Sequence, residues 1–156
     1  MGSKNPAPEG ARMTDYNTDL LRWSEQQSTL LRRRAAGEPV NEADLDWPNI
    51  AEEIESVGRS ELHAMETLLF QALLHRLKAE AWPDNRDAEN WLAESRGFLA
   101  QARRRFVPSM RQKLDISGLY ADALEAMPSV MDGQMPQPVP PVCPVALDEL
   151  LEAPTP

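Results

Sequence analysis

The sequence predicts an all-α protein, a compact bundle of four main helices around a long central helix. Three observations favour this class. Leu, Ala and Met, which are good helix formers, supply much of the apolar content. Several segments repeat apolar residues at helical spacing, and none alternates Val, Ile or Thr with polar residues as a strand does. The 156 residues, 42% of them hydrophobic, suffice for one domain with a single core.

The chain is expected to divide into three parts. Residues 1–13 lack an apolar signal region and predict a disordered leader or a cloning remnant. Residues 14–127 contain the periodic segments and are predicted to form the helical bundle domain. Residues 128–156 are predicted to form a Pro-rich arm and a short terminal helix that pack on the bundle.

The first helix is predicted over residues 18–36, and Gly37 ends it. Arg32–Arg34 lie in its last turn, where cations complement the negative end of the helix dipole. A phosphate-binding patch is the alternative interpretation of these arginines. The inward face is expected to be the stripe of Leu20, Trp23, Gln27, Leu30 and Leu31.

The central helix is predicted over residues 46–81. Asp46 is placed to cap it, and Trp82-Pro83 ends it, because the residue before proline resists helical geometry. Its second half is apolar on nearly every side and should therefore be buried. Gly58 leaves two alternatives open, one continuous helix or two pieces over 46–57 and 59–81. The inward stripe of the first half is predicted to consist of Ile50, Ile54 and Val57.

Two further helices are predicted over residues 86–106 and 109–127, with Pro108 between them. Residues 128–141 lack periodicity and contain many prolines, which indicates an extended arm. A short helix should then begin at Pro144 and bury Leu147, Leu150 and Leu151. This apolar end is expected to pack on its own domain, and packing on a second copy is the alternative.

Charge and composition limit the possible partners. The net charge of −9 repels phosphate backbones, so nucleic-acid binding is disfavoured. Residues 41–66 carry eight acids and one arginine, whereas residues 84–113 carry seven bases and four acids. These regions could face each other or could dock a charged partner. The single Cys143 excludes an internal disulfide and a Cys-based zinc site, and a cytoplasmic location is expected. No stretch approaches the ~20 apolar residues of a membrane span, so no membrane partner is expected.

Two polar residues interrupt the apolar stripe of the central helix. Glu61 and His75 would lie about 21 Å apart on a continuous helix, so each needs a partner from another helix. A buried His75 could serve as an acid/base group or a metal ligand, or it could be a structural histidine. If Gly58 breaks the helix, Glu61 becomes a first-turn acid of the second piece.

Known catalytic patterns fit poorly. Glu52, Glu53 and Glu55 only loosely resemble a carboxylate metal site, because di-iron bundles need Glu-x-x-His pairs and this chain has two histidines. The segment from Arg59 to His63 resembles a shortened Arg-spacer-His signature of toxin-type helical ribonucleases. The phosphate-binding glycine loop and the nucleophile elbow are absent from the sequence. We therefore expect no metal, no cofactor and no catalytic activity.

The pattern of residues is similar to the bacterial domain-of-unknown-function family twenty-nine. The resemblance covers nearly the whole chain, and its most specific part is the acidic segment that ends in Gly-Arg-Ser-Glu and is followed by His-x-Leu-Lys. Arg76 and Ala79 depart from the family pattern, which usually has leucine and an aromatic residue there. The residues that carry the resemblance include Tyr16, Asp19, Trp23, Asp46, Asn49 to Glu61, His75 to Lys78, Val107 to Arg111, and Cys143-Pro144.

The resemblance implies an α-helical fold and a bacterial origin, and it implies no activity. Among the matching positions it marks Glu53, Arg59 and His75 as the first candidates for a polar site, with Glu52, Glu55 and Glu61 as weaker candidates. We expect a non-catalytic interaction or regulatory module that binds another protein, as a monomer or a homodimer. The alternative is an enzyme, such as a nuclease, a phosphoesterase or a toxin–antitoxin component, with its site at the first three residues.

Overall fold

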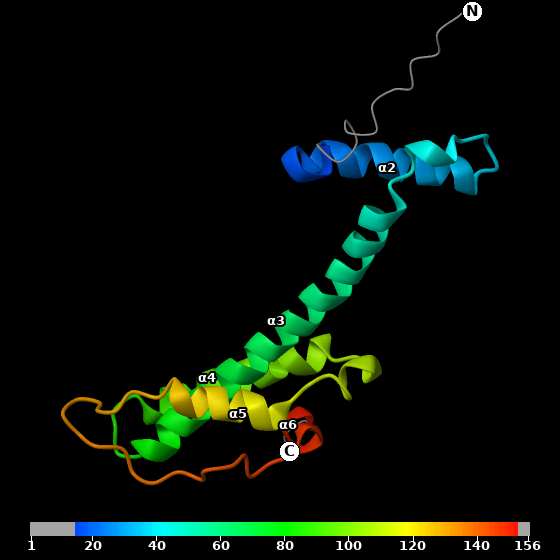
Figure 1. Cartoon of the computed structure of the whole chain (residues 1–156). Helices are drawn as coiled ribbons and strands as arrows, with labels where there is room; N and C mark the ends of the chain where they lie inside the picture. The colour runs from blue at the N-terminus through cyan, green and yellow to red at the C-terminus, as the bar shows by residue number, and fades with distance from the viewer. Residues whose placement is uncertain (1–14, 153–156) are drawn as a thin grey trace, which may run out of the picture. The chain divides into compact units, whose positions relative to one another are not determined.

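The computed structural model describes residues 15–152. All regular elements in these residues are helical, which confirms the all-α class (Figure 1). The chain divides at Gly58 into two compact units. The described helices are α2 (Leu20–Ala35), α3 (Trp47–Ala81), α4 (Ala88–Arg105), α5 (Ile116–Glu125) and α6 (Leu147–Leu151), with 3-10 turns η1 (Glu42–Asp44) and η2 (Pro108–Met110).

Helix α2 follows a short helical segment over residues 15–18 and is capped at both ends. The carboxylate of Asp19 accepts a hydrogen bond from the backbone N–H of Arg22, which satisfies one unpaired donor of the first turn. At the other end, Gly37 has a φ of +78°, a left-handed conformation that glycine adopts without a steric penalty. Glycine at this position therefore ends the helix as the sequence predicts.

The first unit, residues 15–58, has a small core at the joint between α2 and the start of α3. Trp23, Leu45 and Ile50 are buried there. Half-buried side chains from both sides of the joint pack against this core, among them Tyr16, Leu30, Leu31 and Val40. The ring of Tyr16 meets that of Trp23 edge to face, with centroids 4.9 Å apart.

Helix α3 is continuous through Gly58, which settles the alternative that the sequence left open. The predicted burial of Ile54 and Val57 is wrong, because their side chains are 69% and 66% exposed. Within the first unit, α3 contacts the core only around Ile50, near its first turn. Apolar periodicity correctly indicated a helix here. It could not show that the core of the first unit reaches α3 at Ile50 and leaves the next apolar residues uncovered.

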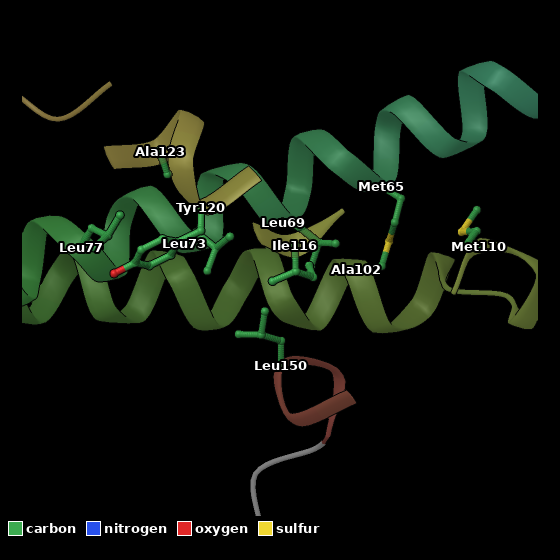
Figure 2. Packing of buried hydrophobic residues seen from close by; sticks show 10 residues of the cluster. All are labelled: Met65, Leu69, Leu73, Leu77, Ala102, Met110, Ile116, Tyr120, Ala123 and Leu150. Carbon is green, nitrogen blue, oxygen red and sulfur yellow. The ribbon is translucent and has the colours of Figure 1, made fainter. Parts of the chain in front are cut away.

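The second unit, residues 59–152, is built around the second half of α3. Met65 and Leu69 are completely buried, and Leu73 and Leu77 are nearly so. Figure 2 shows these side chains between α3, α4, α5 and α6, with Tyr120 and Ile116 reaching in from α5 and Leu150 from α6. No residue from Leu68 to Ala79 is exposed, as the apolar sequence of this half predicts, whereas Glu61, His63 and Thr67 nearer its start are exposed.

Helices α4 and α5 differ in how well the sequence located them. The bounds of α4 are close to those predicted, and its Trp91, Ser95 and Ala102 are buried. The helix predicted from residue 109 begins only at Ile116. Pro108 starts the short turn η2, and the side chain of Asp115 then caps α5 through the N–H of Gly118.

Residues 128–146, which we call the arm, form no helix and make hydrogen bonds to other residues of the second unit. The indole N–H of Trp82 donates to the carbonyl oxygen of Gln134, and the N–H of Gln137 donates to the carbonyl oxygen of Ala81. The hydroxyl of Tyr120 donates to the carbonyl oxygen of Pro140 over 2.7 Å, and burial raises the pKa of this phenol. These bonds satisfy backbone groups of a segment that forms no helix of its own.

The terminal helix begins later than predicted. It starts at Leu147 rather than at Pro144, since Ala146, the residue before it, has an extended backbone. Leu150 is buried in the core of the second unit, and Leu147 and Leu151 are half-buried against it. The thiol of Cys143 donates to the carbonyl oxygen of Val145 and packs against the same core.

The continuity of α3 can be tested at Gly58. A Cβ added there meets no atom within 4 Å, so Gly58→Ala should raise the free energy of unfolding by about 0.5–1 kcal/mol. Urea denaturation of the full chain measures this change. Gly37→Ala is the matched control: it also meets no atom, but it must adopt the positive φ and should destabilise the protein. Loss of stability in Gly58→Ala would contradict a continuous helix.

Candidate functional site

A polar network fixes the joint between α2 and α3. The side-chain amide of Gln27 donates to the carbonyl oxygen of Asp44 over 3.1 Å, and its oxygen accepts the N–H of Asp46 over 2.9 Å. The carboxylate of Asp46 accepts hydrogen bonds from the indole N–H of Trp23 and the amide of Asn49. Gln27 is buried, so pairing both ends of its amide avoids a desolvation cost.

Glu53, the first predicted candidate, takes part in the same joint. Its carboxylate accepts a 2.7 Å hydrogen bond from the hydroxyl of Tyr16. This bond raises the pKa of Tyr16, because the phenol keeps its proton to donate to a negative partner. Glu53 therefore holds the segment before α2 against α3.

A groove lies beside this network in the first unit, with a volume of about 560 Å³. This size is within the range of ligand-binding clefts. The groove is lined by an aromatic and an aliphatic side chain together with four carboxylates. The described residues that line it are Asp15, Trp23, Glu25, Gln26, Gln27, Thr29, Leu30, Asp44 and Asp46.

His75, the second candidate, lies between α3 and α4. Its Nδ1 is 2.8 Å from the carbonyl oxygen of Gln71, and its Nε2 is 3.0 Å from the carboxylate of Glu94. The side chain is 17% exposed, and its ring packs 5.4 Å from that of Phe98. The expectation that His75 has a partner on another helix is therefore confirmed.

The surroundings of His75 favour a structural role. Both ring nitrogens face acceptors, so the imidazolium can donate to both, while a neutral ring can donate to one. These contacts are made within the fold and join α3 to α4.

The remaining candidates lie on exposed turns of α3. Glu52, Glu55, Arg59 and Glu61 are all exposed, and the carboxylate of Glu61 is 3.4 Å from the guanidinium of Arg105 on α4. Arg59 and His75 are sixteen residues apart on one helix, a separation of about 24 Å along the axis. The second unit therefore does not bring these two together, and Glu53 makes its contacts in the first unit.

Metal ligation and membrane insertion find no structural support in residues 15–152. No group of three or more His, Cys, Asp or Glu side chains there is arranged to hold a metal ion. None of the described helices combines the length and the apolar character that crossing a bilayer requires.

Comparison with known proteins finds a matching family and a similar α-helical structure. The family model described as domain of unknown function DUF29 matches residues 16–154. The chain belongs to this family. It is also similar to the crystal structure of an alpha-helical protein of unknown function from Rhodospirillum rubrum, with 28% sequence identity and a TM-score of 0.65. The match covers 89% of this chain and 90% of that one. Curated proteins give no match.

Several residues that carry the resemblance to the DUF29 family make structural hydrogen bonds in the first unit. Trp23 and Asp46 bond to each other, Tyr16 bonds to Glu53, and Asp19 caps α2. These contacts are made within the fold, so the matching positions in this unit describe how the joint is held.

The groove was missed by sequence reasoning. Gln27 was correctly placed on the inward stripe, but Glu25, Gln26 and Thr29 gave no signal of their own. The high density of acids after residue 41 was visible in the sequence. Nothing in the periodicity showed that the connector between α2 and α3 would bring Asp44 and Asp46 back beside α2.

The structural role of His75 predicts a measurable loss of stability. His75→Ala removes its contacts with Glu94, Gln71 and Phe98, and it should lower the free energy of unfolding by about 1–2 kcal/mol. Arg59→Ala, at an exposed position of the same helix, should change it by less than about 0.5 kcal/mol. Chemical denaturation followed by circular dichroism compares the two. Equal stability of His75→Ala and the unmodified protein would contradict this role.

Proposed function

We propose that the protein is a non-catalytic protein-binding module of the bacterial cytoplasm, and that its first unit carries the docking surface. The supporting observation is an exposed apolar strip on the first half of α3, formed by Trp47, Ile54 and Val57. These side chains are 45%, 69% and 66% exposed. Large apolar side chains gathered on one exposed face are typical of interaction sites.

The apolar strip is a continuous feature of one helix face. At 100° per residue, Trp47, Ile54 and Val57 fall within an arc of about 80°. Ile50 lies in the same arc and is buried in the core of the first unit. Glu53 and Glu55 lie on the two sides of this arc. An apolar centre with a polar rim is the usual composition of a protein–protein interface.

A partner that presents an apolar helix face fits this surface best. Helix recognition commonly uses anchors three, four or seven residues apart, and the exposed Trp47, Ile54 and Val57 of α3 are separated by seven and three residues. Full burial of one such side chain stabilises a complex by about 1.5–3 kcal/mol. The strip can therefore supply a substantial part of the binding free energy.

The polar candidates support a binding role over catalysis. Glu53 bonds to Tyr16, His75 bonds to Gln71 and Glu94, and Arg59 lies about 24 Å from His75 along α3. General acid–base catalysis needs its groups within hydrogen-bonding reach of one substrate. His75 and Glu94 are close enough for such a pair, but the second ring nitrogen of His75 already faces the carbonyl oxygen of Gln71.

Substitution of the apolar strip tests the proposal. Ile54→Gln with Val57→Gln should leave stability within about 1 kcal/mol, because both side chains are largely exposed and glutamine is a good helix former. The variant should lose its partner. A photoreactive residue at position 54, introduced in the native host, should crosslink to that partner in the unmodified background.

The matched control is Leu92→Gln, which changes a 40% exposed leucine on α4. It should retain the partner, and a photoreactive residue at position 92 should give no crosslink. Crosslinking from position 54 that Val57→Gln leaves unchanged would contradict the proposal. Crosslinks only between copies of this chain would identify the strip as a homodimer interface instead.

A further inference from the structure

We propose that the groove in the first unit binds an arginine or lysine side chain from a basic segment of the protein partner. This inference rests on the proposed function and names the chemistry of the partner. It concerns a surface different from the apolar strip, so the two can fail separately. Size, charge and the rigidity of the walls each support it.

The groove has the dimensions for a long side chain. Its volume is about 560 Å³, and its walls come from α2 and from the connector that leads to α3. Trp23 and Leu30 supply apolar surface, which suits the methylene stem of lysine or arginine. The aromatic ring can also attract a cation through its π face.

The charge of the groove selects a cation. Asp15, Glu25, Asp44 and Asp46 line it, and none of its described lining residues is basic. Residues 15–58 carry ten acids and four arginines, a net charge of −6. Two of those arginines, Arg33 and Arg34, already pair with Glu38 and Glu42 at the end of α2. A concave surface lined by one sign of charge concentrates ligands of the opposite sign.

The walls of the groove are held before any ligand arrives. Trp23 is 5% exposed, and its N–H is bonded to Asp46. Gln27 is 9% exposed, and both ends of its amide are bonded to the connector. A preorganised site loses little side-chain freedom on binding, which favours affinity.

A basic peptide segment explains these features better than other occupants. Nucleic acid would be repelled by the carboxylates. A second copy of this chain could offer Arg104 and Arg105, which are exposed at the end of α4. That arrangement predicts self-association through the groove, so the test includes it as an outcome that overturns the proposal.

The experiment measures binding of a fluorescein-labelled peptide of alternating arginine and alanine to the full-length protein by fluorescence anisotropy. The peptide should bind, and its affinity should fall as salt is raised. A peptide with glutamate in place of arginine should not bind. Asp15→Asn with Glu25→Gln removes two groove charges and should raise Kd about fivefold, ~1 kcal/mol.

The matched control is Glu52→Gln with Glu55→Gln, which removes two charges from exposed positions of α3 outside the groove. It should change Kd by less than about twofold. Absence of binding, or an equal effect of the two double variants, would overturn the groove as the site. Concentration-dependent self-association in ultracentrifugation, abolished by Asp15→Asn with Glu25→Gln, would assign the groove to a second copy.

The two proposals remain distinguishable after this experiment. If the peptide does not bind but the crosslink at position 54 forms, the proposal for the groove is refuted and the proposal for the apolar strip is supported. If the peptide binds but no crosslink forms at position 54, the proposal for the groove is supported and the proposal for the apolar strip is refuted.

Discussion

The burial of one apolar face of α3 is the constraint on which the second unit depends. Met65, Leu69, Leu73 and Leu77 are four residues apart and form one row on the helix, which we call the α3 row. The side chains of α4, α5 and α6 pack against this row (Figure 2). The arm has no helix of its own, and it is held by hydrogen bonds to Ala81, Trp82 and Tyr120. Because Tyr120 packs in the core that the α3 row forms, the position of the arm depends on that core.

In the first unit, the apolar face of the same helix is only partly buried. The small core of this unit covers only part of that face. Ile50 is therefore buried, while Ile54 and Val57 are exposed. Exposed apolar area has an unfavourable free energy in water, and a partner that covers it gains that energy on binding. In the same unit, the hydrogen bonds between Gln27 and the connector fix the walls of the acidic groove. One short unit thus offers both an apolar and an acidic binding feature.

The sequence predicted those parts of the fold that depend on local signals. Helical periodicity located α2, α3 and α4, and the apolar second half of α3 correctly indicated burial. The late start of α5 was missed because the residues directly after Pro108 were taken as the first turn of the helix, whereas Pro108–Met110 form a separate 3-10 turn. The exposure of Ile54 was missed because periodicity shows which face is apolar, and long-range packing decides whether anything covers it.

The candidate site was less predictable for the same reason. The need for a partner of His75 followed from its apolar neighbours, but Glu94 could be identified only when α3 and α4 were seen together. The groove depends on a connector that returns Asp44 and Asp46 to α2, a contact that no local pattern encodes. Residues far apart in the sequence therefore determine the features that we assign to binding.

Hydrogen exchange along α3, read by mass spectrometry on the full-length protein, tests the central claim most directly. If the α3 row holds the second unit and the first half of the helix is left uncovered, amides of residues 65–77 should exchange slowly. Those of residues 51–61 should then exchange much faster, because their local opening requires little loss of buried contacts. Equal protection along both stretches would contradict the account, since it would show that the first half of α3 is packed as firmly as the second.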